Sequence, residues 1–123
     1  MRDEALMPVL WVRDADAALA WYRRLGFDLE FEHSAGPTLD RTMAIVRRGE
    51  LGVILSNREQ GSKADSLIYL RVTDLRKIET EFEVSATPFF GGEQVELHDP
   101  DGNRIRVVTS TLPRRKGRLI GPS

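Results

Sequence analysis

The chain has 123 residues, of which 41% are hydrophobic and 30% are charged, and this size and composition are typical of one globular domain with its own core. It contains no cysteine, which excludes disulfide bonds, thiolate nucleophiles and cysteine-ligated metals. No apolar run approaches the ~20 residues of a membrane span, and the acidic N-terminus is unlike a signal peptide. We therefore expect a cytoplasmic protein without a membrane partner.

The formal net charge of −1 is unevenly distributed along the chain. Four basic residues and no acidic residue lie in 112–123, so the rest of the chain carries about −5. An acidic body disfavours nucleic acid as a partner. We expect residues 1–111 to form a single domain, followed by a basic C-terminal tail over 112–123.

The first half of the chain predicts the order β-α-β-β-β. An apolar run over residues 6–12 indicates a buried strand, and Asp14 is the expected N-cap of a helix that ends before Gly26. Trp21 and Tyr22 are expected on the core face of this helix. Further strands are expected at residues 27–33, 41–47 and 51–55, the last two joined by a short hairpin turn.

The second half predicts a similar order. Strands are expected at 66–72, 93–98 and 104–108, with a weak one around 86–90. Asp74 is the expected cap of a short helix that buries Leu75, Ile78 and Phe82. Leu10, Val12 and Asp14 correspond to Leu70, Val72 and Asp74 at an offset of 60 residues, which indicates either a duplicated module or a chance similarity.

The strand, Asp and helix of VLWVRDADAALAWYRRLGF, together with the late DPDGN turn at 99–103, resemble the glyoxalase/bleomycin resistance/dioxygenase superfamily. The resemblance covers residues 6–110 and implies the vicinal oxygen chelate fold. That fold is α+β and has two βαβββ modules, here about residues 5–55 and 66–110. The sequence is most similar in form to the bleomycin resistance proteins, which sequester a drug as homodimers.

The resemblance also implies where metal-dependent members carry their ligands. These positions are Met7, Leu67 and Arg106 here, with a matching place near Val53 in the first half. None of them offers the imidazole or carboxylate that a divalent ion requires, and Arg106 would repel it. We therefore expect no metal, no other cofactor and no catalytic residue, and an enzyme is the less favoured alternative.

A ligand groove is expected on the sheet faces that carry Trp11 and Tyr69, because alternate residues of a strand share a face. The alternative for this pair is an ordinary place in the core. Phe89 and Phe90 are expected in a loop, where they are further ligand contacts. The alternatives for this pair are a weak strand or a dimer contact. Arg106 faces either the groove or solvent at a sheet edge. The expected ligand-binding residues are Trp11, Tyr69, Arg71, Phe89, Phe90, Arg104 and Arg106.

These expectations favour a metal-free small-molecule-binding protein that acts as a homodimer, with grooves formed across the assembly, and that sequesters a bleomycin-type antibiotic. The acidic body suits a cationic drug, whereas Arg71, Arg104 and Arg106 suit a carboxylate or phosphate. A metal-dependent glyoxalase-like lyase, isomerase or dioxygenase is one alternative. A ligand-free interaction dimer is the other.

Overall fold

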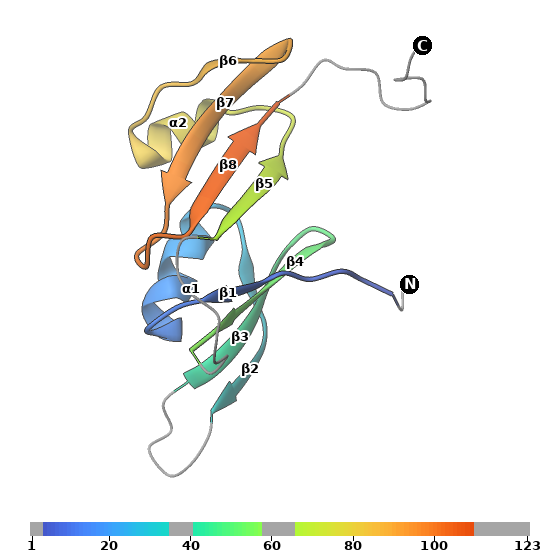
Figure 1. The fold of residues 1–123 in the computed structure, drawn as a ribbon, viewed down its shortest axis with the longest axis vertical. Coiled ribbons are helices and arrows are strands. Elements are labelled where there is room, and N and C mark those ends of the chain that lie inside the picture. Colours follow the sequence, from blue (N-terminus) through green and yellow to red (C-terminus); the bar gives the residue numbers. More distant parts are fainter. Residues whose placement is uncertain (1–3, 35–40, 58–65, 110–123) are drawn as a thin grey trace. The chain divides into compact units, whose positions relative to one another are not determined.

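The computed structural model describes residues 4–34, 41–57 and 66–109 (Figure 1). The chain divides into two compact units. Unit 1 comprises Met1–Leu67 and His98–Arg104, and unit 2 comprises Ile68–Leu97 and Ile105–Ser123. None of the helices in the described ranges has the length and apolar character needed to cross a membrane.

In its described residues, unit 1 contains one helix and a four-stranded sheet in the order β1-β4-β3-β2. Strand β1 pairs with β4 in parallel, and the other neighbours are antiparallel. The elements are β1 (Val9–Trp11), α1 (Ala15–Arg24), β2 (Asp28–Ser34), β3 (Arg41–Arg48) and β4 (Leu51–Ser56). The predicted order is confirmed, although the first strand is shorter than the apolar run 6–12 indicated.

Helix α1 begins after Asp14 and ends before Gly26, as the capping signals predict. The Asp14 carboxylate accepts a hydrogen bond from the backbone N–H of Asp16 at 2.9 Å, and Gly26 after the last turn has a φ of +96°. The helix buries a stripe at helical spacing that consists of Ala15, Ala18, Leu19 and Tyr22.

The prediction that Trp21 lies on this core face is wrong. Trp21 is only partly buried, whereas the neighbouring Tyr22 is 1% exposed. The buried residues of α1 centre the stripe close to the direction of Tyr22, and Trp21, which is rotated by about 100° from Tyr22, points away from that direction. The Trp21 and Tyr22 rings make an edge-to-face contact, with 4.7 Å between their centroids.

Regular alternation along the strand expected at 27–33 would put Phe27, Leu29 and Phe31 on one face, and the structure differs from this. Leu29 pairs with Val46 and Phe31 pairs with Ile45, so Glu30 is an extra residue in a β-bulge. A bulge reverses the side to which the following residues point. Phe27 is therefore buried, while Phe31 is 51% exposed on the opposite side of the sheet.

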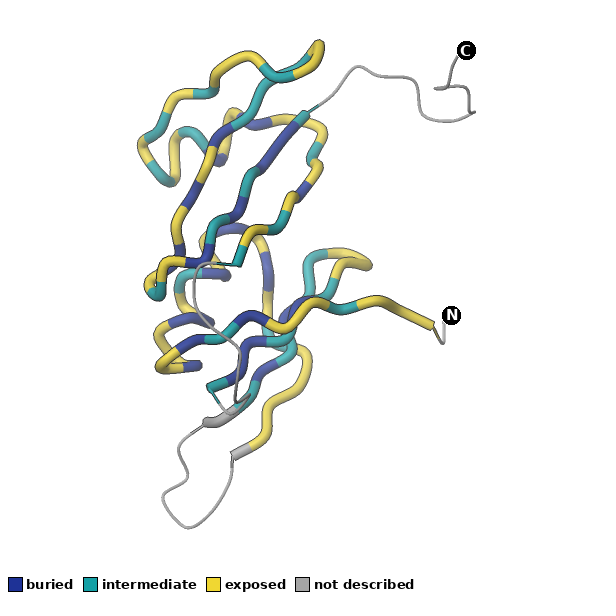
Figure 2. Tube along the Cα trace, in the orientation of Figure 1, coloured by how far each residue is buried: buried dark blue, intermediate teal, exposed yellow. Residues whose placement is uncertain are grey.

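Unit 2 contributes the second helix and most of the second sheet, whose order β5-β8-β7-β6 repeats the pattern of the first sheet. The elements are β5 (Leu67–Arg71), α2 (Arg76–Phe82), β6 (Thr87–Phe89), β7 (Gly92–His98) and β8 (Arg104–Val108). Buried and more exposed residues alternate along β7 (Figure 2). The matching element orders confirm two βαβββ modules and the α+β class.

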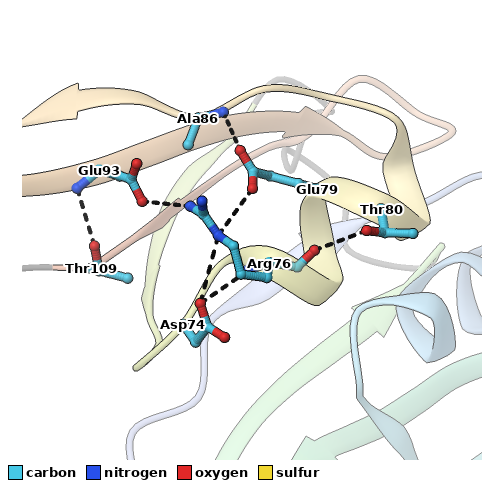
Figure 3. A network of polar contacts seen from close by, with 7 residues as sticks. All are labelled: Asp74, Arg76, Glu79, Thr80, Ala86, Glu93 and Thr109. Carbon is cyan, nitrogen blue, oxygen red and sulfur yellow. Dashed lines mark hydrogen bonds and ion pairs between the residues drawn. The ribbon is translucent and has the colours of Figure 1, made fainter.

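Charged contacts fasten α2 to the sheet of unit 2 (Figure 3). The Arg76 guanidinium lies 2.6 Å from Glu93 on β7, 3.1 Å from Glu79 and 3.7 Å from Asp74. Asp74 also accepts from the backbone N–H of Arg76, but the N-cap residue is Leu75, one position later than predicted. The Glu79 carboxylate accepts a hydrogen bond from the backbone N–H of Ala86 at 2.7 Å. This bond links the segment that follows α2 to the helix.

The extent of a single domain over residues 1–111 stays a prediction. The basic tail 112–123 lies outside the described residues, as do residues 35–40 and 58–65.

Candidate functional site

The DPDGN turn belongs to unit 1 and surrounds a buried carboxylate. Asp99 is 4% exposed. Its Oδ2 accepts from the Tyr22 hydroxyl at 2.8 Å and from Asn103 Nδ2 at 2.9 Å. Its Oδ1 accepts from the backbone N–H groups of Asp101 and Asn103, at 2.8 and 2.9 Å. Four hydrogen-bond donors therefore satisfy this buried carboxylate inside the unit.

Asn103 and Asp101 attach the same turn to neighbouring backbone. Asn103 is fully buried, and its Nδ2 also donates to the Trp11 carbonyl oxygen at 2.9 Å. Its Oδ1 accepts from the backbone N–H of Ser66 at 3.1 Å, and Asp101 Oδ1 accepts from the N–H of Arg13 at 3.1 Å. The motif thus has a structural role in unit 1, which explains its residue types without assigning it any chemistry.

Burial raises the pKa of Tyr22 far above its ordinary value of 10.0, and the charge and hydrogen bond of Asp99 raise it further. The phenol therefore stays protonated as the donor to Asp99 and is no candidate general base near neutral pH.

The open face of the first sheet, defined as the side away from α1, is largely apolar. Strand pairing brings Val9, Ile54, Ile45 and Phe31 into one row across all four strands. Val9 is 40% exposed and Phe31 is 51% exposed, whereas Ile45 and Ile54 are partly exposed. Such a surface is unusual for a face that contacts only water.

Trp11 lies on this open face and is partly exposed. Its neighbours Leu10 and Val12 point to the opposite side and are buried. Val53, which stands near the metal-ligand position that the resemblance implies in the first half, is 4% exposed and alternates with Ile54, so it belongs to the core on the α1 side. The neighbouring Ile54 lies on the open face, because a shift of one residue along a strand reverses the face.

The second sheet carries an aromatic cluster on its own open face, the side away from α2, formed by Tyr69, Phe89 and Phe90. The ring centroids of Tyr69 and Phe89 are 6.2 Å apart, and those of Phe89 and Phe90 are 4.8 Å apart in an edge-to-face arrangement. Tyr69 is 52% exposed and Phe90 is 75% exposed. Phe89 belongs to the short strand β6, which confirms the weak strand expected there.

Arg106 lies beside this cluster and is held by two partners. Its Nε donates to Glu96 Oε1 at 2.8 Å, and its Nη1 donates to the Tyr69 hydroxyl at 3.0 Å. Its guanidinium carbon lies 5.8 Å from the centre of the Tyr69 ring, within range of a cation–π interaction. The hydrogen bond to Glu96, followed by that to Tyr69, raises the pKa of Arg106.

Glu96 is the residue of this site that the sequence analysis missed. Its signal was present, since it alternates with the buried Val95 and Leu97 along β7 and so lies on the same open face as Arg106. The Glu96 carboxylate balances the charge of Arg106, so the local positive charge expected from the three arginines is smaller. Arg71 is exposed at the end of β5, and Arg104 is partly buried at the start of β8.

The residues at the expected metal positions do not fit a divalent ion. Arg106 is engaged with Glu96, while Met7 and Leu67 offer a thioether and a hydrocarbon. Within the described residues, no group of three or more His, Asp or Glu side chains is arranged to hold a metal. His33 and His98 are both exposed at strand ends.

Two βαβββ modules, each with its strands in the order first, fourth, third, second, define the vicinal oxygen chelate fold. Residues 5–107 match the model of the Glyoxalase/Bleomycin resistance protein/Dioxygenase superfamily, and the chain belongs to that superfamily. None of the curated protein sequences matches the chain significantly.

Solved structures agree with this assignment. A bleomycin-binding protein complexed with bleomycin is 25% identical, with a TM-score of 0.62, over 86% of this chain and 98% of that one. TnmS3, an antibiotic-binding protein from Streptomyces, is 20% identical, with a TM-score of 0.69, over 89% and 98%. Lactoylglutathione lyase from Agrobacterium tumefaciens is 22% identical, with a TM-score of 0.65, over 88% and 95%. The last two similarities show the fold alone.

Proposed function

We propose that this protein binds a small organic molecule without the help of a metal, and that the ligand is an antibiotic of the bleomycin type. The observation that carries the proposal is the exposed aromatic cluster of Tyr69, Phe89 and Phe90 beside the Arg106–Glu96 pair. Exposed aromatic rings next to a few fixed polar groups are typical of small-molecule sites. The similarity to a bleomycin-binding protein supports the choice of ligand class.

The remaining expected contacts, Trp11, Arg71 and Arg104, are kept in this proposal as ligand-binding residues. Trp11 is partly exposed on the apolar open face of the first sheet, and Arg71 is exposed on the same strand as Tyr69. We further propose a cytoplasmic homodimer in which the open faces are covered by ligand and by the second chain, with no nucleic-acid or membrane partner.

The second candidate is a metal-dependent lyase, isomerase or dioxygenase, and the similarity in fold to lactoylglutathione lyase favours it. The residues at the expected metal-ligand positions disfavour this candidate. They are Met7, Leu67 and Arg106, none of which supplies an imidazole or a carboxylate. The third candidate is an interaction dimer without ligand, for which the exposed apolar row of unit 1 is the supporting feature.

A thermal-shift screen combined with elemental analysis separates these candidates. The screen covers bleomycin-type glycopeptides, planar aromatic compounds and small organic acids, each added to chelator-treated protein. A ligand at ~100 times its Kd stabilises the fold by roughly 2.7 kcal/mol. Stabilisation by an antibiotic in the absence of metal supports the proposal. If the protein binds metal stoichiometrically and no compound stabilises it without that metal, the metal-dependent enzyme becomes the better candidate.

A further inference from the structure

An imidazole and a thioether are direct neighbours on two adjacent strands of the first sheet. His33 on β2 is the register partner of Met43 on β3, and these strands lie side by side (Figure 1). Residues directly opposite each other in an antiparallel pair have Cβ atoms about 4.5–5.5 Å apart on the same face of the sheet. His33 is exposed and Met43 is partly exposed, so solvent has access to both side chains.

Both side chains lie on the open face of the first sheet. Met43 alternates with Ala44, which is fully buried on the α1 side. The pairing is regular from Phe31 to His33, so His33 lies on the same face as the exposed Phe31. The bulge at Glu30 brings His33 to this face, because regular alternation from the start of β2 would direct it to the α1 side.

The row that contains this pair continues across the sheet with a small residue and an aromatic one. Ser56 on β4 is the register partner of both Met43 and Trp11. Its small side chain, which is 3% exposed, leaves space for the larger side chains on either side. The row contains no carboxylate, the ligand that hard divalent cations prefer. A sulfur donor near an aromatic face suits a soft cation instead.

We propose that His33 and Met43 form a binding site for a soft monovalent cation of the Cu⁺ type. Thioether sulfur selects Cu⁺ over hard cations, and imidazole nitrogen is a good ligand for copper. Monovalent d¹⁰ ions accept two or three ligands, so one thioether and one imidazole on neighbouring strands are a sufficient protein contribution. The site shares no residue with the positions of Met7, Leu67 and Arg106, and it is independent of the small-molecule site proposed above.

NMR titration of the full chain with Ag⁺, a redox-inert analogue of Cu⁺, in a chloride-free buffer tests the proposal. The methyl signal of Met43 and the ring signals of His33 should shift together, with one Kd and one ion per chain. Met43→Leu keeps the size and the apolar character of the side chain, whereas His33→Gln removes the imidazole. Each should lower the affinity for Ag⁺ by at least about tenfold, because one of the two donors is lost.

Met7→Leu and His98→Gln are the matched controls, since they remove the other thioether and the other imidazole of the described ranges. Met7 packs over Gly52, where a Cβ atom would lie 2.9 Å from its sulfur. Both controls should leave the affinity for Ag⁺ unchanged. Equal losses in Met7→Leu and Met43→Leu would show that Ag⁺ binds single thioethers and would overturn the proposal. Unchanged affinity in His33→Gln, or different Kd values for the two sets of signals, would overturn it as well.

Discussion

The Asp99 carboxylate is buried, and its four donors come from a tyrosine, an asparagine and two backbone N–H groups. A buried charge is stabilised only while its hydrogen bonds are complete, so each donor contributes more than an ordinary surface hydrogen bond. Because Tyr22 and Asp99 are 77 positions apart in the sequence, this contact also fixes the late turn to the first helix.

We expect Tyr22→Phe to lower the free energy of unfolding by about 1.5–3 kcal/mol, the usual effect of removing a donor from a buried charged group. Urea denaturation at pH 7 measures it. Trp21→Phe is the control, because it keeps an aromatic ring at a partly exposed position and should cost about 1 kcal/mol or less. Equal stability of Tyr22→Phe and the wild type would show that the bond to Asp99 contributes nothing.

The same pair gives a pH dependence. Burial and Asp99 raise the pKa of Tyr22 in the folded state above 10.0, so the unfolded chain loses this proton first as the pH rises. The contribution of the protonated Tyr22 to the free energy of unfolding is fully present below pH 10. Above pH 10 it is lost, by up to ~1.4 kcal/mol per pH unit. The difference in unfolding free energy between wild type and Tyr22→Phe should therefore shrink between pH 10 and 11. A constant difference would contradict the assignment.

At the scale of the elements, helix α2 depends on its contacts with the sheet. It has seven residues, too few for an independently stable helix, and its Arg76 contacts three carboxylates (Figure 3). These contacts are exposed, and exposed ion pairs contribute little individually. The buried Leu75 and Ile78 therefore carry most of the packing, while Arg76 positions the first turn.

We expect Arg76→Ala to lower global stability by at most about 1 kcal/mol while increasing amide hydrogen exchange within 76–82. Lys77→Ala, at an exposed neighbouring position, should leave both unchanged. A loss above about 2 kcal/mol, or exchange spread over the whole chain, would mean that the cluster supports the core of unit 2 rather than the helix alone.

The sequence predicted most elements because their signals are local. Asp14 and Gly26 mark the ends of α1, and the last strand is expected at 104–108, where β8 lies. The bulge at Glu30 could not be predicted in this way, because it depends on how β2 pairs with a strand more than ten residues later. The Glu96–Arg106 pair depends similarly on which strands are neighbours, although the faces of both residues follow from alternation.

For the whole molecule, the apolar open face of the first sheet supports the proposed homodimer. We expect light scattering at micromolar concentration to give twice the chain mass of 13.9 kDa. Phe31→Glu, which puts a charge at the exposed end of the apolar row, should weaken the dimer by tenfold or more without unfolding the chain. A monomeric mass at all concentrations would contradict the proposed homodimer, and only the ligand would then cover the open faces.

Calorimetric titration of chelator-treated protein with metal-free bleomycin tests the central claim most directly, since that claim is ligand binding without a metal. We expect saturable binding with a fixed stoichiometry, unchanged when Mn²⁺, Ni²⁺ or Zn²⁺ is added, because Met7, Leu67 and Arg106 offer no site for these ions. Absence of binding by bleomycin, combined with tight stoichiometric uptake of one of these metals by the protein, would contradict the account.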